Sequence, residues 1–125
     1  DVNAAVVASI NAGQAHFQEP DLQMLLSAAT ETGRLRATTV PEPAQFFIIA
    51  VPTPVAAGGA PDMAFVEAAA RTIAPVLATG SVVILESTSP VGSTTRLAEI
   101  FSEERPDLAI PRYRDEDAEA DIALC

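Results

Sequence analysis

Apolar residues along this chain follow two different spacings, and the change of spacing separates predicted helices from predicted strands. Near the start, apolar side chains recur every three to four residues between Asn3, a good N-cap, and Gly13, a common helix stop. This pattern predicts a helix over about 4–12. The same spacing returns from Asp21 to Gly33 and predicts a second helix there.

Three stretches are apolar without a helical period. FFIIAV at 46–51 and SVVIL at 81–85 are continuous apolar runs, and DIALC at 121–125 resembles a third. Such runs are typical of strands that are covered on both faces of a parallel sheet. A further short strand is predicted at 34–39, before the turn PEP.

Helical spacing also occurs between these strands. Asp62 is expected to cap a helix that turns Phe65 and other apolar side chains inward and reaches its last turn near Pro75. Another helix is predicted from Ser93 to about Glu104. Helices that alternate with buried strands indicate an α/β fold with a mostly parallel sheet and right-handed crossovers.

Composition and charge exclude several classes of function. The chain has 49% hydrophobic residues and a formal net charge of −10, so it is globular and carries no basic surface for nucleic acid. Its basic residues are all Arg, which excludes a Walker-type phosphate loop and a lysine Schiff base. No apolar run approaches the ~20 residues needed to cross a bilayer. A cytoplasmic location is the default expectation.

The residue types also offer no metal site. The single Cys125 has no partner Cys, and we expect a buried, inert thiol in the last strand. His16 has no acid or second ligand nearby in sequence, and we expect it to be a loop residue.

The chain has features of an internal piece of a longer protein. It starts without Met and passes from Asp1 directly into helical spacing, and its last residues resemble a strand halted in its middle. We therefore expect residues 1–125 to form part of one domain of a longer chain.

Polar residues follow the predicted strands at positions where a ligand could bind. In open α/β sheets, ligands bind beyond the carboxyl ends of the strands. Val51–Pro54 (VPTP) and Glu86–Thr88 (EST) leave the two clearest strands, and Asp1 stands before the first helix. A carboxylate after the second strand of a nucleotide-binding unit can accept both ribose hydroxyls, which favours NAD over NADP.

The segment ESTSPVGSTT at 86–95 holds more hydroxyl side chains than a turn requires. Thr88 would face the same crevice as the proline-flanked Thr53, and Thr94 lies at the start of a helix whose free N–H groups suit an anion. Simpler roles stay open: Thr53 as a turn cap, Ser93 or Thr94 as a helix N-cap, Asp1 as an ordinary polar residue. Glu86 could pair with an Arg or act in catalysis.

Taken in order, these segments resemble the N-terminal cofactor domain of the UDP-glucose/GDP-mannose dehydrogenase family. The resemblance covers essentially the whole chain, and the VPTP and ESTSPVGST segments are its most specific parts. The similar segments are DVN (1–3), EPDL (19–22), GRLRATT (33–39), IAVPTP (49–54), PDMAFVEAAARTIAPVL (61–77) and VILESTSPVGST (83–94).

The resemblance implies a Rossmann-like, doubly wound, mostly parallel sheet. It places the first strand and the glycine-rich pyrophosphate turn before Asp1, so we expect the sheet of this chain to be incomplete. It also implies an NAD-dependent, four-electron oxidation of a nucleotide-sugar primary alcohol to a carboxylate, with two NAD used in turn. UDP-N-acetyl-D-mannosamine is the favoured substrate, and UDP-glucose, UDP-GlcNAc and GDP-mannose stay open.

The resemblance assigns roles to individual residues. Asp1 matches the acid that binds ribose, and Thr88 matches the family threonine beside the nicotinamide that positions a catalytic water. The implied cofactor contacts are Asp1, Val51, Pro52, Thr53, Pro54, Ser87, Thr88 and Thr94.

Other parts of the family's machinery belong to later domains. The nucleophilic cysteine and the sugar contacts lie downstream, so Cys125 is not the nucleophile and this piece alone is expected to be inactive. The full enzyme is expected to be a homo-oligomer. A non-catalytic doubly wound module, such as a receiver-like domain, is the alternative from another class, although such a domain would want a Lys and this chain has none.

Overall fold

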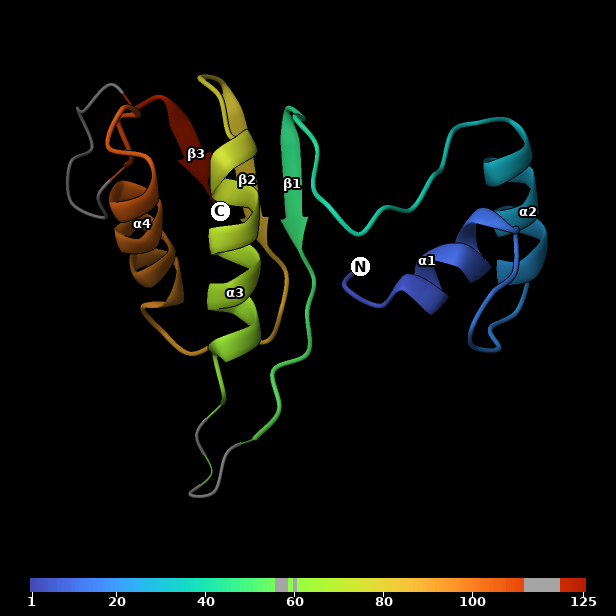
Figure 1. Ribbon diagram of the computed structural model, residues 1–125. Coiled ribbons are helices and arrows are strands. Elements are labelled where there is room, and N and C mark those ends of the chain that lie inside the picture. The colour runs from blue at the N-terminus through green and yellow to red at the C-terminus, as the bar shows by residue number, and fades with distance from the viewer. Residues whose placement is uncertain (56–58, 60, 112–119) are drawn as a thin grey trace. The chain divides into compact units, whose positions relative to one another are not determined.

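The computed structural model describes residues 1–55, 59, 61–111 and 120–125. Part of the predicted irregular stretch at 52–61 and most of the acidic run at 115–121 lie outside the described residues. The chain forms two compact units, Asp1–Pro41 and Glu42–Cys125, and each is described here by itself (Figure 1).

The first unit consists of two helices, α1 (Ala4–Asn11) and α2 (Leu22–Glu31). The predicted cap of α1 is confirmed, because the Asn3 Oδ1 accepts hydrogen bonds from the backbone N–H groups of Ala5 and Val6 at 3.0 and 3.4 Å. Asp21 marks the start of α2 as predicted, but its side chain makes no capping hydrogen bond.

The turn after α1 is bound to α2. Gly13 has a φ of 69°, and a Cβ there would lie 3.2 Å from the Thr30 Oγ1, so any other residue would be strained in this turn. The Gly13 carbonyl accepts hydrogen bonds from the Gln23 Nε2 and the Ser27 Oγ at 2.6 and 3.1 Å. Side-chain hydrogen bonds therefore hold the two helices together at this end.

The prediction of a strand at 34–39 is wrong, because the segment is irregular. Its backbone groups bond to the first unit's own helices instead of a neighbouring strand. The N–H groups of Arg34 and Leu35 donate to the Ala29 carbonyl at 2.9 and 3.1 Å. The Asn11 amide donates to the Ala37 carbonyl at 3.0 Å and accepts from the Ala37 N–H at 2.7 Å.

The second unit is a parallel α/β sheet. Its strands are β1 (Phe46–Ile49), β2 (Ser81–Leu85) and β3 (Ile122–Leu124), in the order β1-β2-β3. The connections contain α3 (Ala64–Ile73), the short 3₁₀ turn η1 (Ala74–Val76) and α4 (Ser93–Glu104). The parallel sheet, the strand at 81–85 and the helix from Ser93 to Glu104 are all confirmed.

Both crossover helices lie on the same face of this sheet (Figure 1). The strand order runs in one direction, and right-handed crossovers then place successive helices on one side. This is the arrangement of one mononucleotide-binding half of a Rossmann fold.

The prediction that β1 is covered on both faces is wrong for the described residues. Phe47 and Ile49 are buried in the core, whereas Phe46 and Ile48 are 64% and 61% exposed. Successive side chains of a strand point to opposite faces, and α3 and α4 cover one of them. The uninterrupted apolar run therefore alternates between a buried and an exposed side.

The core lies between the sheet and the two helices. Its largest fully buried side chains are Phe101, Leu97, Ile100, Val66 and Val83. The expectation that Phe65 points inward is wrong, since 51% of Phe65 is exposed while the neighbouring Val66 is buried.

The expectation of a buried thiol at Cys125 is also wrong. The residue follows β3, and its backbone continues the ladder by donating to the Val83 carbonyl at 3.0 Å. Its side chain is exposed.

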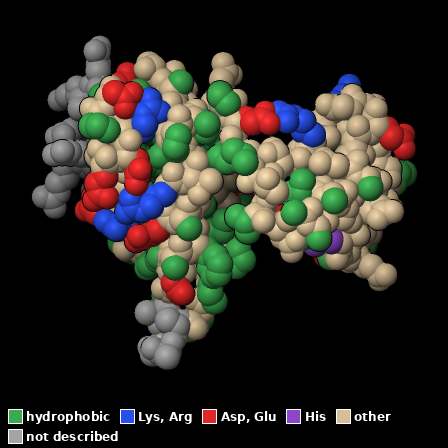
Figure 2. Space-filling view, viewed as in Figure 1, with side chains coloured by type: hydrophobic (Ala, Val, Ile, Leu, Met, Phe, Trp, Pro, Cys, Tyr) green, Lys and Arg blue, Asp and Glu red, His purple; other side chains and the backbone are tan. Residues whose placement is uncertain are grey.

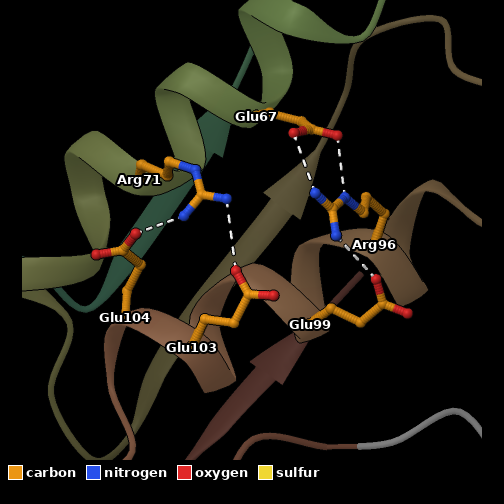
Figure 3. Close-up of polar contacts among 6 residues, drawn as sticks. All are labelled: Glu67, Arg71, Arg96, Glu99, Glu103 and Glu104. Carbon is orange, nitrogen blue, oxygen red and sulfur yellow. Dashed lines mark hydrogen bonds and ion pairs between the residues drawn. The ribbon is translucent and has the colours of Figure 1, made fainter.

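Ion pairs join α3 to α4 on the outer surface of the second unit. Arg71 of α3 contacts Glu103 and Glu104 of α4, and Arg96 of α4 contacts Glu67 of α3 (Figure 3). In the space-filling view, acidic and Arg side chains lie side by side over these helices (Figure 2). Each Arg there is close to carboxylates.

Candidate functional site

The two candidate segments of the second unit leave adjacent strands at the same edge of the sheet. Ile49 and Leu85, the last residues of β1 and β2, are register partners in a parallel pair. Val51–Pro54 follows the first strand and Glu86–Thr88 follows the second. The carboxyl edge of the sheet therefore brings these two segments together, as the sequence predicted.

Ser87 connects the two segments directly. Its Oγ accepts a hydrogen bond from the Val51 N–H at 2.9 Å and donates to the Val51 carbonyl at 2.8 Å. The contact is partly buried, and the Oγ also lies 3.4 Å from the Ile49 carbonyl. One hydroxyl thus satisfies both backbone groups of Val51 at the point where the ladder has ended.

The two threonines of these segments carry hydroxyls that are available to a ligand. Thr53 is half-buried between Pro52 and Pro54, and Thr88 is exposed. Within the described part of the chain, neither side chain makes a hydrogen bond. Thr53 accordingly caps no turn there, and the prolines limit the conformations of its segment.

The bend before α4 is shaped by Gly92 and Ser93. Gly92 has a φ of 93°, in the left-handed region that favours glycine, and is the residue before the first turn of the helix. The Ser93 hydroxyl turns back and donates to the Pro90 carbonyl at 2.7 Å. No side chain caps α4, so Ser93 as an N-cap is wrong.

The uncapped start of α4 leaves backbone donors for a ligand. The first N–H groups of a helix have no intrahelical acceptor, and together with the helix dipole they favour anions or polarised atoms. Thr94 is half-buried in this first turn.

Glu86 is exposed at the end of β2. Its backbone N–H extends the ladder by donating to the Ile49 carbonyl at 3.1 Å. The carboxylate forms no ion pair with any residue that the structure describes, so the Arg partner considered for it is not found there.

Asp1 belongs to the other unit, Asp1–Pro41. It is exposed, and its Oδ1 accepts a hydrogen bond from the Asn3 N–H at 2.7 Å. A carboxylate has about four lone-pair sites, so acceptor capacity remains for ribose hydroxyls.

The ion pairs between α3 and α4 shift the pKa values of their members. Hydrogen bonds from the Arg96 guanidinium hold the pKa of the Glu67 carboxyl below its ordinary value, and Glu67 and Glu99 raise the pKa of Arg96. Sequence reasoning missed this pairing, because Glu67 and Arg96 are 29 residues apart and belong to different helices.

The described residues show neither a metal site nor a membrane span. No group of three or more His, Cys, Asp or Glu side chains among them could hold a metal ion. None of the helices they form is long and apolar enough to cross a membrane. His16 is a loop residue, as predicted, and its ring packs edge-on against Phe17 with centroids 4.7 Å apart.

Curated proteins similar to this chain carry dehydrogenase names. The chain is 52% identical to an NDP-N-acetyl-D-galactosaminuronic acid dehydrogenase of Ralstonia nicotianae. It is also 52% identical to the UDP-N-acetyl-D-mannosamine dehydrogenase of Escherichia coli. Both comparisons cover 100% of this chain and 30% of the relative, so the chain spans about 30% of the length of these curated proteins.

A solved structure shares the fold. The UDP-D-ManNAc dehydrogenase of Pyrococcus horikoshii matches with a TM-score of 0.84 at 31% identity, over 99% of this chain and 28% of that one. Residues 1–125 also match the family described as "UDP-glucose/GDP-mannose dehydrogenase family, NAD binding domain". The resemblance drawn from the motifs is confirmed: the chain belongs to the UDP-glucose/GDP-mannose dehydrogenase family, as its NAD-binding domain.

Proposed function

We propose that this chain is the NAD-binding part of a longer nucleotide-sugar dehydrogenase that oxidises UDP-N-acetyl-D-mannosamine to the corresponding uronic acid. One observation carries the proposal: VPTP and EST, the most specific family segments, lie at one carboxyl edge of a parallel sheet and are bonded to each other. The 52% identity to a UDP-N-acetyl-D-mannosamine dehydrogenase supports the choice of substrate.

The donor set of this edge fits NAD. It offers the hydroxyls of Thr53 and Thr88, and the uncapped first turn of α4 adds backbone N–H groups for polar atoms. In the other unit, Asp1 retains carboxylate acceptors for the adenosine ribose. NAD, when bound, supplies the hydride acceptor for each of the two oxidations.

The residues of the VPTP segment would position the cofactor. Thr53 donates or accepts through a hydroxyl whose backbone is restricted on both sides by Pro52 and Pro54. Val51 precedes Pro52, and both of its backbone groups bond to the Ser87 hydroxyl. Because this segment has little conformational freedom to lose, binding costs less entropy.

Thr88 is the proposed catalytic residue of this chain. Its exposed hydroxyl follows the carboxyl end of β2 and would orient the water that enters when the aldehyde is carried to the carboxylate. Thr94, in the first turn of α4, would contact the cofactor from the other end of the bend.

The candidate nucleotide sugars must be distinguished by experiment, since sugar contacts would lie in residues beyond this chain. The equal identity to an NDP-N-acetyl-D-galactosaminuronic acid dehydrogenase makes an N-acetylgalactosamine-type nucleotide sugar the second candidate. A cytoplasmic location, a homo-oligomeric state and a role in polysaccharide biosynthesis stay predictions of the same proposal.

The test is a substrate panel with the full-length protein that contains this chain. NADH formation is followed with UDP-N-acetyl-D-mannosamine, UDP-N-acetylgalactosamine, UDP-glucose, UDP-GlcNAc and GDP-mannose, and the product is identified by mass. We expect UDP-N-acetyl-D-mannosamine to give the highest kcat/KM and two NADH per carboxylate formed. One NADH per sugar, or no NAD-dependent turnover, would reject the four-electron dehydrogenase.

A further inference from the structure

The Ser87 hydroxyl occupies a place where the backbone ladder between β1 and β2 stops. The ladder's last backbone hydrogen bond there runs from the Glu86 N–H to the Ile49 carbonyl, at 3.1 Å. Among the described residues no further backbone hydrogen bond joins the two segments beyond it, so a side chain must satisfy the next backbone groups if they are to stay ordered away from water.

The bonds of the hydroxyl leave little for a ligand. A serine hydroxyl has one proton, and the Val51 carbonyl at 2.8 Å is a closer acceptor for it than the Ile49 carbonyl at 3.4 Å. One of its two lone pairs accepts the Val51 N–H at 2.9 Å. The single donor of Ser87 is therefore used within the protein.

We propose that Ser87 is a positioning residue that aligns the VPTP segment with the EST segment, so that Thr53 and Thr88 face the cofactor together. This role replaces the direct cofactor contact expected for Ser87 from the sequence, and it rests on the proposed function.

Ser87 and Val51 are close in sequence to the two threonines, so one hydroxyl is enough to align both of them. Val51 is held at both its N–H and its carbonyl, and the next residue is Pro52, whose φ is fixed by its ring. The direction of the chain into Thr53 is thus set by Val51. On the other side, Thr88 is the residue immediately after Ser87.

Two readouts test this role in the full-length protein. With Ser87→Ala, the KM for NAD should rise about tenfold, on the scale of one lost intramolecular hydrogen bond, and kcat should fall as well, because the adjoining Thr88 loses its alignment. In the NAD-free protein, the Val51 amide should exchange its hydrogen about tenfold faster, because its acceptor is gone. Ser102→Ala is the matched control, since the half-buried Ser102 hydroxyl bonds to no described residue.

Ser87→Thr is the control that distinguishes loss of the hydroxyl from misfolding of the Ser87→Ala variant. Threonine keeps the Oγ, so it should restore both the KM for NAD and the slow exchange of the Val51 amide. A Ser87→Thr variant that behaves like Ser87→Ala would contradict the positioning role.

A double-mutant cycle separates positioning from direct contact. Thr53→Val should itself raise the KM for NAD, and Ser87→Ala should cost less in that background because it acts through the same segment. Independent, multiplying effects would instead indicate that Ser87 touches the cofactor.

The two levels of the proposal fail in different ways. A wild-type protein that shows no NAD-dependent turnover rejects the proposed function. An active wild type whose Ser87→Ala variant keeps the original KM for NAD and the original Val51 exchange rejects the positioning role alone.

Discussion

Arg96 and Glu67 form a bidentate ion pair that connects α4 to α3. The guanidinium Nε and Nη2 donate to Oε1 and Oε2 of the carboxylate at 3.0 and 3.3 Å (Figure 3). The Nη1 of Arg96 also donates to Glu99 one turn further along α4, at 3.0 Å. This geometry fixes the first turn of α4, which follows the bend at Gly92, against its neighbouring helix.

The Glu67–Arg96 pair predicts a specific dependence of stability on pH. Since the pKa of folded Glu67 lies below its ordinary value of 4.5, the carboxylate contributes stability above that value and loses it as the pH falls through the lower folded pKa. Glu67→Gln should therefore lower the free energy of unfolding at about pH 7, and the difference from wild type should shrink toward about pH 3.

The measurement is urea unfolding of both proteins across this range, at low and high salt. Added salt should also shrink the difference, because the pair is partly exposed. Glu31→Gln serves as the control, since Glu31 is exposed and forms no ion pair with any described residue. A difference between wild type and Glu67→Gln that stays constant with pH would contradict the assignment.

The core of the second unit predicts a large effect at Phe101. Phe101 has 0% of its surface exposed, so Phe101→Ala should cost about 3–5 kcal/mol of unfolding free energy by leaving a cavity. Phe65→Ala removes the same atoms from a side chain that is 51% exposed, and it should cost about 1 kcal/mol or less. Denaturant unfolding of the two variants compares them, and equal losses would show that the helix faces are assigned incorrectly.

The left-handed backbone at Gly92 predicts that replacing this glycine destabilises the fold even though a Cβ there would meet no steric clash. Apart from its chain neighbours, no heavy atom of the described residues lies within 4 Å of a Cβ built at Gly92, so the cost of Gly92→Ala comes from its φ of 93° and should be about 1–2 kcal/mol. Thr95→Ala, three residues further on in the first turn of α4, should change the free energy of unfolding by about 0.5 kcal/mol or less. Thermal and urea unfolding test this, and a neutral Gly92→Ala would argue against the described bend.

Much of this fold could be predicted because local signals agree with the tertiary structure. Asn3 is a residue type that often caps helices, and it caps α1. The apolar run at 81–85 lies between turn residues that fix its ends. The shared edge of VPTP and EST followed from parallel strands alone.

The remainder depends on contacts that a linear pattern does not contain. The run at 46–51 reads as buried on both faces, but only the placement of α3 and α4 shows that Phe46 and Ile48 are exposed. Ser93 has the right residue type for a cap, but Gly92 holds the N-cap position and Ser93 is already the first residue of α4, where its hydroxyl donates to the Pro90 carbonyl. The two hydrogen bonds between the Ser87 hydroxyl and the Val51 backbone join residues 36 positions apart, and nothing in the local sequence predicts them.

Thr88 carries the sharpest kinetic prediction. In the full-length enzyme, Thr88→Val should lower kcat about a hundredfold, because the water would lose its orienting hydroxyl. The KM for NAD should change by about threefold or less. Steady-state and single-turnover kinetics test this, with the exposed Thr39→Val as control, and an unchanged kcat would remove Thr88 from the catalytic step.

The central claim is that VPTP and the bend from Glu86 to Thr94 together form the NAD site. Amide hydrogen exchange of the full-length protein, measured with and without NAD, tests it most directly. We expect NAD to slow exchange at the amides of Val51, Thr53, Thr88 and Thr94, and to leave the exposed turn of α3 around Arg71 unchanged. Slowed exchange elsewhere, with these four amides unaffected, would contradict the account.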